Sequence, residues 1–115
     1  MTRLGWPCCL AALLVGCSTP TTIYSWGRYE DQVYALYAHP EKATPELQVI
    51  LMEGDYERAR AKNQRVPPGF HAHLGYLYVQ LGKLDRARRE LETEKAEFPE
   101  STVFMDRLLA NLQNK

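Results

Sequence analysis

The sequence is poor in cysteine, and no cysteine lies beyond residue 17. Its three cysteines are Cys8, Cys9 and Cys17, in a chain of 115 residues. This distribution excludes a disulfide framework and a cysteine-ligated metal site from the body of the chain. Charge of one sign is lacking as well, because 14 Lys and Arg residues balance 14 Asp and Glu residues. The chain as a whole therefore carries no electrostatic footprint for nucleic acid or for anionic lipid.

Long apolar runs, strand-like alternation and catalytic motifs are also missing. The longest apolar run, LGWPCCLAALLVG at residues 4–16, is too short to span a bilayer as a helix. No stretch alternates apolar and polar residues between turns as a half-buried strand does, so we expect an all-α fold. No P-loop, nucleophile elbow or pair of acids at catalytic spacing is present. We therefore expect no enzyme activity, no cofactor and no small-molecule substrate.

The first 16 residues have the composition of a secretory signal peptide. Arg3 is their only charge, and the apolar run leads into LVGC at residues 14–17. This tetrad resembles the lipobox of bacterial lipoproteins, in which the cysteine, here Cys17, is lipidated and becomes the new N-terminus. The alternative is an ordinary signal peptide that contains a cysteine.

The lipobox resemblance implies an anchor and a location. Cleavage before Cys17 would leave acyl chains on this residue, and acyl chains contribute roughly 0.8 kcal/mol per buried CH₂ group. In lipoproteins of this type, a serine such as Ser18 after the cysteine implies sorting to the outer membrane. We expect a signal peptide at 1–16, a lipidated tether at 17–24 and one domain at 25–115, at the cell outer membrane with its body in the periplasm. The alternative is a body that faces the cell surface.

The remaining sequence predicts about five helices and a single small core. Apolar residues recur at steps of three and four, and proline or glycine separates the segments. Thr44 and Pro45 form a good helix start, while Gly54 leaves open whether residues 45–63 form one helix or two; we favour one. The helices are expected at about 26–39, 45–63, 70–81, 84–98 and 102–113.

Residues 68–101 follow the period of a tetratricopeptide unit. The pattern W-x₂-L-G-x₂-Y, A-x₃-F, P is matched, with substitutions at its aromatic positions, by His71, Leu74, Gly75, Tyr78, Ala87, Leu91 and Pro99. Glycine and alanine at these positions let two helices approach closely. His71 is expected to face inward and His73 to lie near the edge of a groove. Because residues two apart on a helix point roughly 200° apart, the two histidines cannot bind one metal ion.

The apolar spacing also predicts which helix faces are buried. For the second helix the stripe is Leu47, Ile50, Leu51 and Ala59, and the last helix is expected to cap the open face of the unit with Val103, Phe104, Leu108, Leu109 and Leu112. In the fourth helix we expect ion pairs at i,i+4 on a solvated face, namely Asp85–Arg89, Arg86–Glu90 and Arg88–Glu92. The aromatic residues between Tyr24 and Tyr37 either pack on the following helices or form a partly exposed docking patch.

Three stretches together resemble a family of small bacterial outer-membrane lipoproteins with a tetratricopeptide-like body. They are YSWGRYEDQVYALY, VPPGFHAHLGYLYVQLG and FPESTVFMDRLL. Members of this family are often encoded beside a curli-secretion-type lipoprotein. The resemblance implies an accessory part in an outer-membrane secretion or surface-assembly complex, with fellow lipoproteins as possible partners.

The function we expect is a lipid-anchored helical scaffold that binds another cell-envelope protein. The expected contact residues are Ala72, His73, Tyr76, Val79 and Gln80, with Trp26 and Tyr34. The alternative is a lipoprotein that regulates a peptidoglycan synthase. The seven residues from Cys17 to Tyr24 argue against it, because they span at most ~25 Å when extended. No metal or nucleic acid is expected as a ligand.

Overall fold

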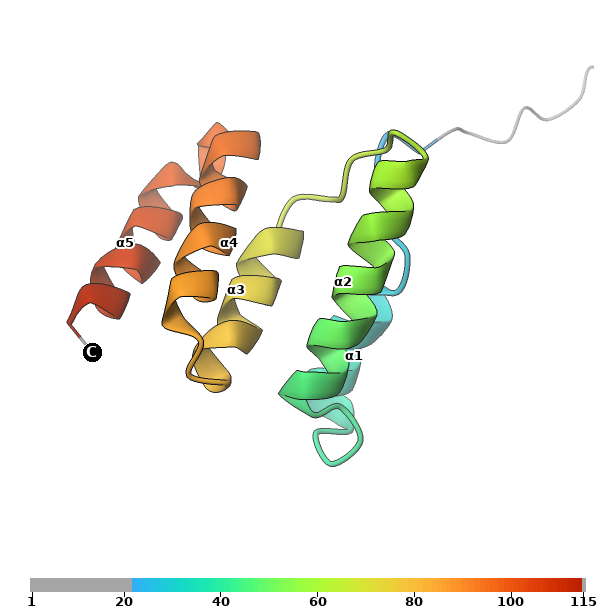
Figure 1. Cartoon of the computed structure of the whole chain (residues 1–115), viewed down its shortest axis with the longest axis horizontal. Helices are drawn as coiled ribbons and strands as arrows, with labels where there is room; N and C mark the ends of the chain where they lie inside the picture. The colour runs from blue at the N-terminus through green and yellow to red at the C-terminus, as the bar shows by residue number, and fades with distance from the viewer. Residues whose placement is uncertain (1–21, 115) are drawn as a thin grey trace, which may run out of the picture.

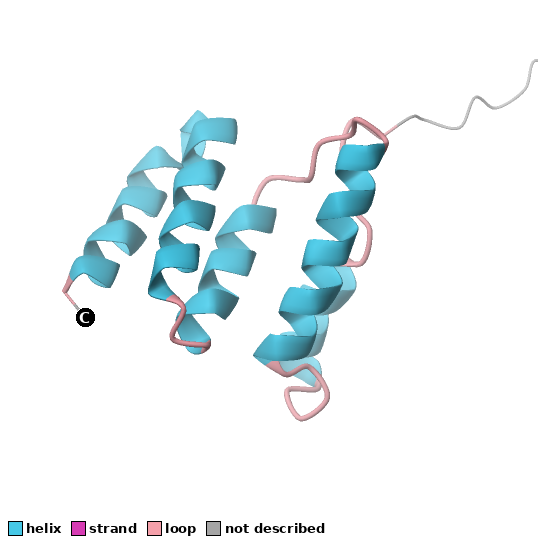
Figure 2. Cartoon of the chain, in the orientation of Figure 1, coloured by secondary structure: helices cyan, strands magenta, loops and turns pink. Residues whose placement is uncertain are grey.

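The chain folds into five α-helices that alternate in direction (Figure 1). The computed structural model describes residues 22–114. The helices are α1 (Tyr29–Ala38), α2 (Pro45–Ala61), α3 (Phe70–Gln80), α4 (Leu84–Glu97) and α5 (Thr102–Gln113), with a 3₁₀ turn, η1, at Pro99–Ser101. Helices α2, α3, α4 and α5 pack in chain order, and α1 lies behind α2 in the view of Figure 1. Figure 2 shows only helices and loops over the described residues. The expected all-α fold with a C-terminal helix is confirmed.

The predicted helix boundaries follow from local signals that the structure bears out. The Thr44 hydroxyl accepts a hydrogen bond from the backbone N–H of Leu47, and Pro45 is the first residue of α2. Helix α2 runs without a break through Gly54. Gly82 adopts a φ of +70° in the turn between α3 and α4, a backbone conformation that glycine adopts without steric cost.

The first helix begins three residues later than its aromatic spacing predicts. Gly27 has a φ of +49°, and a Cβ atom there would lie 2.9 Å from Cγ of Asp55. The backbone N–H of Arg28 donates to Oδ2 of Asp55 at 3.0 Å, so this turn is fastened to the middle of α2. Helix α1 therefore starts at Tyr29, after the turn.

The predicted apolar stripe of α2 is wrong at Leu47 and Ile50, whereas Ala59 is buried as predicted. Leu47 and Ile50 are 44% and 65% exposed, whereas Val49 and Met52 are buried. Gln48 and Asp55 complete the buried face with Ala59. Polar residues can occupy this face because each has a hydrogen-bond partner, which offsets the free-energy cost of burying a polar group. The Gln48 amide nitrogen donates to the backbone carbonyl of Gln32 at 2.9 Å.

The core face of α5 is also displaced from the prediction. Met105, Leu109 and Leu112 are buried, while Val103 and Phe104 are 68% and 60% exposed. Leu108 is half-buried at the edge of this face. Helix α5 thus covers α4 through a narrower stripe than expected.

None of the three expected ion pairs within α4 forms. Instead, Arg86 pairs with Glu53 of α2 at 3.3 Å, and Glu90 pairs with Nδ1 of His71 on α3 at 2.7 Å. The charged residues of α4 thus tie this helix to its neighbours rather than to itself.

The α3–α4 hairpin contains the centre of the core. A Cβ atom on Gly75 would lie 3.1 Å from Cδ2 of Leu91 and 3.3 Å from the Ala87 carbonyl oxygen, so the two helices touch where the small residues were expected to permit it. His71 is buried, as predicted. The remaining buried side chains of the hairpin are Phe70, Leu74, Leu77, Tyr78, Ala87, Leu91 and Glu94.

The first described residues are fastened to the connection between α2 and α3. Tyr24 forms a bridge with Arg65, and the backbone N–H of Ser25 donates to the Arg65 carbonyl at 2.7 Å. The Tyr24 ring meets the Phe98 ring edge-on, at the end of α4. The expected signal peptide and Cys17 lie outside the described residues. None of the helices within residues 22–114 has the length and apolar content to cross a bilayer.

Candidate functional site

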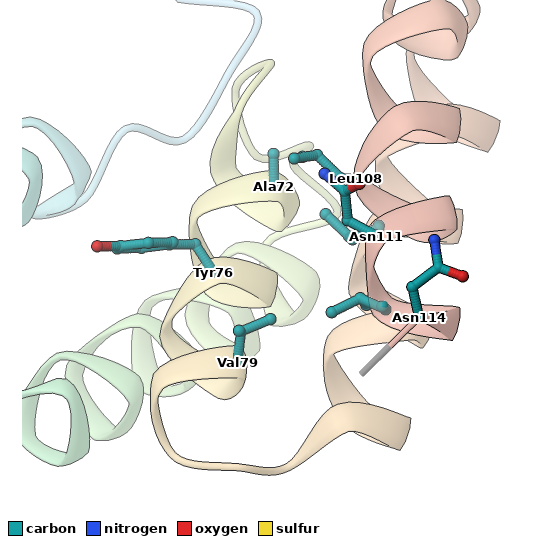
Figure 3. Close-up of a pocket in the computed structure, with 8 residues that line it drawn as sticks. Ala72, Tyr76, Val79, Leu108, Asn111 and Asn114 are labelled. Atoms are coloured by element: carbon teal, nitrogen blue, oxygen red, sulfur yellow. The ribbon is translucent and has the colours of Figure 1, made fainter.

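An apolar groove lies between α3 and α5, with α4 beneath it. Its volume is about 440 Å³. Ala72 and Val79 on α3 face Leu108 and Asn111 on α5 across the groove, and the Tyr76 ring extends away from α5 (Figure 3). The complete lining is Ala72, Tyr76, Val79, Leu91, Leu108, Asn111, Leu112 and Asn114. We call these eight residues the α3–α5 groove.

The groove contains no charged residue. Its lining side chains are aliphatic except for Tyr76, Asn111 and Asn114. The Tyr76 hydroxyl accepts a hydrogen bond from the Gln80 amide at 2.6 Å, which fixes the ring although it is 47% exposed. Such a surface can take up an apolar side chain and can hydrogen-bond a peptide backbone through its amides.

A row of aromatic rings runs from Trp26, near the first described residues, to this groove. The ring centroids of Trp26 and Tyr29 lie 6.3 Å apart, those of Tyr29 and His73 6.1 Å, and those of His73 and Tyr76 6.2 Å. We call these four residues the aromatic row. Burial, followed by the charge of Glu94, raises the pKa of Tyr29.

His73 is a neutral member of this row. Burial lowers the pKa of His73, so the imidazole is uncharged at neutral pH. Its Nε2 lies 3.2 Å from Oε1 of Gln48. Because the Gln48 amide nitrogen already donates to Gln32, the His73 Nε2–H is the donor in this bond. His73 therefore faces α2 and does not line the α3–α5 groove.

The structure brings together only part of the predicted contact set. Ala72, Tyr76 and Val79 line the groove, and Gln80 supports Tyr76. Trp26 packs on Tyr29 at the far end of the aromatic row. Tyr34 lies in a separate shallow hollow on α1, with Tyr29, Glu30, Val33 and Tyr37.

The opposite wall of the groove was missed as a binding surface. Leu108 and Leu112 were expected only to cover the core, while Leu91 was expected inside the hairpin and Asn111 and Asn114 were not singled out. One sequence feature could have indicated this wall, because asparagines near the apolar stripe of a terminal helix can border a cleft. That a cleft exists at all depends on how far α5 packs from α3, which no local pattern encodes.

The buried titratable groups of the hairpin, His71 and Glu94, hold α3 and α4 together. His71 Nδ1 pairs with Glu90, and His71 Nε2 lies 3.8 Å from Glu97. The buried Glu94 carboxylate accepts the backbone N–H groups of Gly69 and Ala72 at the start of α3, at 2.6 and 3.2 Å. Within the described residues no group of three His, Cys, Asp or Glu side chains has an arrangement that could hold a metal ion.

A family model matches residues 23–108 of the chain and is described as a domain of unknown function (DUF4810). The chain belongs to this family. No curated protein and no solved structure matches the chain.

The DUF4810 segment includes most of the candidate site. It begins at Ile23, includes the whole aromatic row and α3, and ends at Leu108 within α5. Asn111, Leu112 and Asn114, which complete the far wall of the groove, lie beyond it.

Proposed function

We propose that this DUF4810 chain is a lipid-anchored helical scaffold whose α3–α5 groove binds an apolar segment of another cell-envelope protein. The observation that carries the proposal is the groove itself, which is uncharged, largely aliphatic and about 440 Å³ in volume. In this role the chain is an accessory subunit of an outer-membrane secretion or surface-assembly complex, built on a tetratricopeptide-like hairpin.

The chemistry of the groove supports a protein segment as its occupant. Inserting one leucine-sized side chain into it would contribute roughly 1.5–3 kcal/mol. The tyrosine at its border is half-exposed and fixed by Gln80, so little side-chain entropy is lost when a partner covers it. Tyrosine is also among the residue types enriched at the energetic centres of protein interfaces.

The location in this proposal rests on the sequence before the described residues. LVGC at 14–17 supports lipidation at Cys17, and the short tether would hold the body close to the membrane. A small helical body kept at a membrane is suited to bringing other envelope proteins together.

The test is site-specific photocrosslinking in intact cells. A photoreactive phenylalanine analogue would replace Asn111, which is exposed at the wall of the groove, and in a matched strain Arg89, which is exposed on the outer face of α4. We expect a crosslinked protein from position 111 and none from position 89. Val79→Ser, which removes apolar surface from the opposite wall, should weaken the crosslink, and Cys17→Ser should abolish it.

The identity of the crosslinked protein decides between the functions. Outer-membrane lipoproteins or secretion subunits support the assembly role. A peptidoglycan synthase would replace that role with regulation of cell-wall synthesis. Equal crosslinking from positions 111 and 89, or none from 111 in a stable chain, would refute the groove as the binding site.

A further inference from the structure

Two exposed apolar side chains lie among the first residues that the structure describes. Ile23 is 78% exposed and Trp26 is 40% exposed. Tyr24 between them is held against Arg65 and Phe98, so this stretch has a fixed position at the end of the molecule formed by the α2–α3 connection. Neither Ile23 nor Trp26 lines the α3–α5 groove.

Two cations share this end of the molecule. Lys62, at the end of α2, and Arg65 are both exposed, and neither forms an ion pair with another described residue. Arg65 is held over the Phe98 ring at 5.2 Å and donates to the Glu97 carbonyl. The neighbouring Arg60 is balanced by Glu57 at 3.6 Å. Two carboxylates lie near these cations: Glu97, which is 3.8 Å from Nε2 of His71, and Glu100 of η1, which is exposed.

We infer that this end of the body docks on an anionic lipid surface, with Ile23 and Trp26 in the interfacial layer and Lys62 and Arg65 over the headgroups. We call these four residues the docking patch. An isoleucine and a tryptophan beside unpaired cations match the apolar boundary and the negative charge of such a surface. This inference rests on the lipid anchoring in the proposed function, but it involves none of the groove residues.

The length of chain between the anchor and the patch favours the lipid surface over other partners. Five residues lie between Cys17 and Ile23, and the six residue-to-residue steps reach at most about 21 Å when extended. An anchored chain therefore presents the docking patch to the bilayer at a high effective concentration. Docking would fix the orientation of the helical stack, which a flexible tether alone would leave free.

Trp26 provides a direct probe of this contact. The chain has two tryptophans, Trp6 and Trp26, so Trp6→Phe leaves Trp26 as the single fluorophore whether or not the N-terminal segment is cleaved. The purified full chain with this substitution would be reconstituted into vesicles of phosphatidylcholine alone or of an equimolar mixture with phosphatidylglycerol. Flotation would establish attachment, and Trp26 emission would be recorded with acrylamide in the water or with brominated acyl chains in the bilayer.

In the anionic vesicles we expect a blue-shifted Trp26 emission, strong quenching by brominated lipid and loss of most acrylamide quenching. Lys62→Gln should lower the ratio of docked to undocked chain by about fivefold, the effect of one cation near an anionic surface. Lys42→Gln is the matched control, because it removes the same charge from an exposed site just before α2, and it should have no effect. Ile23→Ser should reduce the blue shift in both vesicle types.

Three results would overturn the inference, and they differ in what else they overturn. A chain that floats with the vesicles while Trp26 stays fully open to acrylamide is anchored but not docked, and the groove proposal is untouched. A chain that does not float at all refutes the anchor and the docking together. Equal effects of Lys62→Gln and Lys42→Gln would show that the docking patch has no specific role.

Discussion

Buried polar side chains fix how the elements of this small protein meet. Asp55 lies on the core face of α2 with its side chain 7% exposed, and it accepts hydrogen bonds from the backbone and guanidinium of Arg28 and from Arg58. Burial alone would raise the pKa of Asp55, but these hydrogen bonds and the positive charge of Arg28 outweigh burial and lower the pKa. The carboxylate thus fastens the turn before α1 to α2.

Replacing Asp55 by asparagine should destabilise the fold in a pH-dependent way. At neutral pH we expect a loss of about 1–3 kcal/mol in the free energy of unfolding, because charged hydrogen bonds are replaced by weaker ones. Since the folded-state pKa is below the unfolded value, the wild-type contribution is present above the ordinary aspartate pKa of about 4 and is lost as the pH falls through the folded pKa. Urea unfolding of both proteins across this range is the measurement.

Asp31→Asn serves as the control for that experiment. Asp31 is exposed in the first turn of α1 and should cost less than about 1 kcal/mol, mainly through the helix dipole. A difference between wild type and Asp55→Asn that stays constant from neutral to acid pH would mean that the carboxylate charge is not what holds the turn.

At the scale of helices, the closest approach is between α3 and α4. Gly75 and Ala87 permit this approach. At the other end of the hairpin, Glu94 of α4 accepts hydrogen bonds from two backbone N–H groups at the start of α3. The Glu94 carboxylate satisfies donors that a helix start leaves free. The hairpin therefore combines steric fit with an internal cap.

Two glycine substitutions should have opposite effects on stability. Gly75→Ala places a Cβ atom 3.1–3.3 Å from Leu91 and the Ala87 carbonyl, and the overpacking should outweigh the gain in helix propensity by about 1 kcal/mol. Gly54→Ala on α2 meets only the end of the Arg58 side chain, at 3.4 Å, so it should stabilise by up to about 1 kcal/mol. Thermal and urea unfolding of the pair would check both signs. Stabilisation by Gly75→Ala would show that α3 and α4 have room to separate.

At the scale of the whole molecule, the stack depends on its last helix. A helical hairpin cannot bury its apolar face alone and needs a neighbour on each side. Helices α1 and α2 cover one side, and α5 covers the other with three buried side chains, Met105, Leu109 and Leu112. Helix α5 also supplies one wall of the α3–α5 groove, so stability and the proposed binding site depend on the same element.

A chain that ends at Ser101 should lose its cooperative unfolding. Removing α5 removes three buried side chains, each of which contributes roughly 1.5–3 kcal/mol to the free energy of unfolding. Their sum is comparable with the whole stability of a small domain. We expect increased binding of the dye ANS and a broad thermal transition by circular dichroism. Removal of Asn114 and Lys115 alone should leave the transition sharp. A truncated chain that still unfolds cooperatively would show that α1 to α4 suffice as a folding unit.

Local sequence signals predicted the helices well and their faces less well. Thr44-Pro45, Gly82 and the proline after His39 act over a few residues, so the boundaries they set could be found without a structure. The exposure of Ile50 and the burial of Asp55 could not be predicted in this way, because the free-energy cost of burying a carboxylate depends on Arg28, which is 27 residues away. Three of the eight groove residues, Ala72, Tyr76 and Val79, were among the predicted contact residues because they follow from one repeat pattern, whereas the α5 wall does not.

The sequence by itself determined an all-α chain, the order of its helices, most of their ends and the close contact at Gly75, because helix propensity, capping and steric fit operate between near neighbours. Only the tertiary structure decided which faces of α2 and α5 are buried. It joined Gln48 and Asp55 to α1, left a cleft between α3 and α5, and brought Lys62 and Arg65 beside Ile23 and Trp26. These arrangements depend on distances between segments far apart in the chain, which packing of the whole fold sets and no single segment encodes.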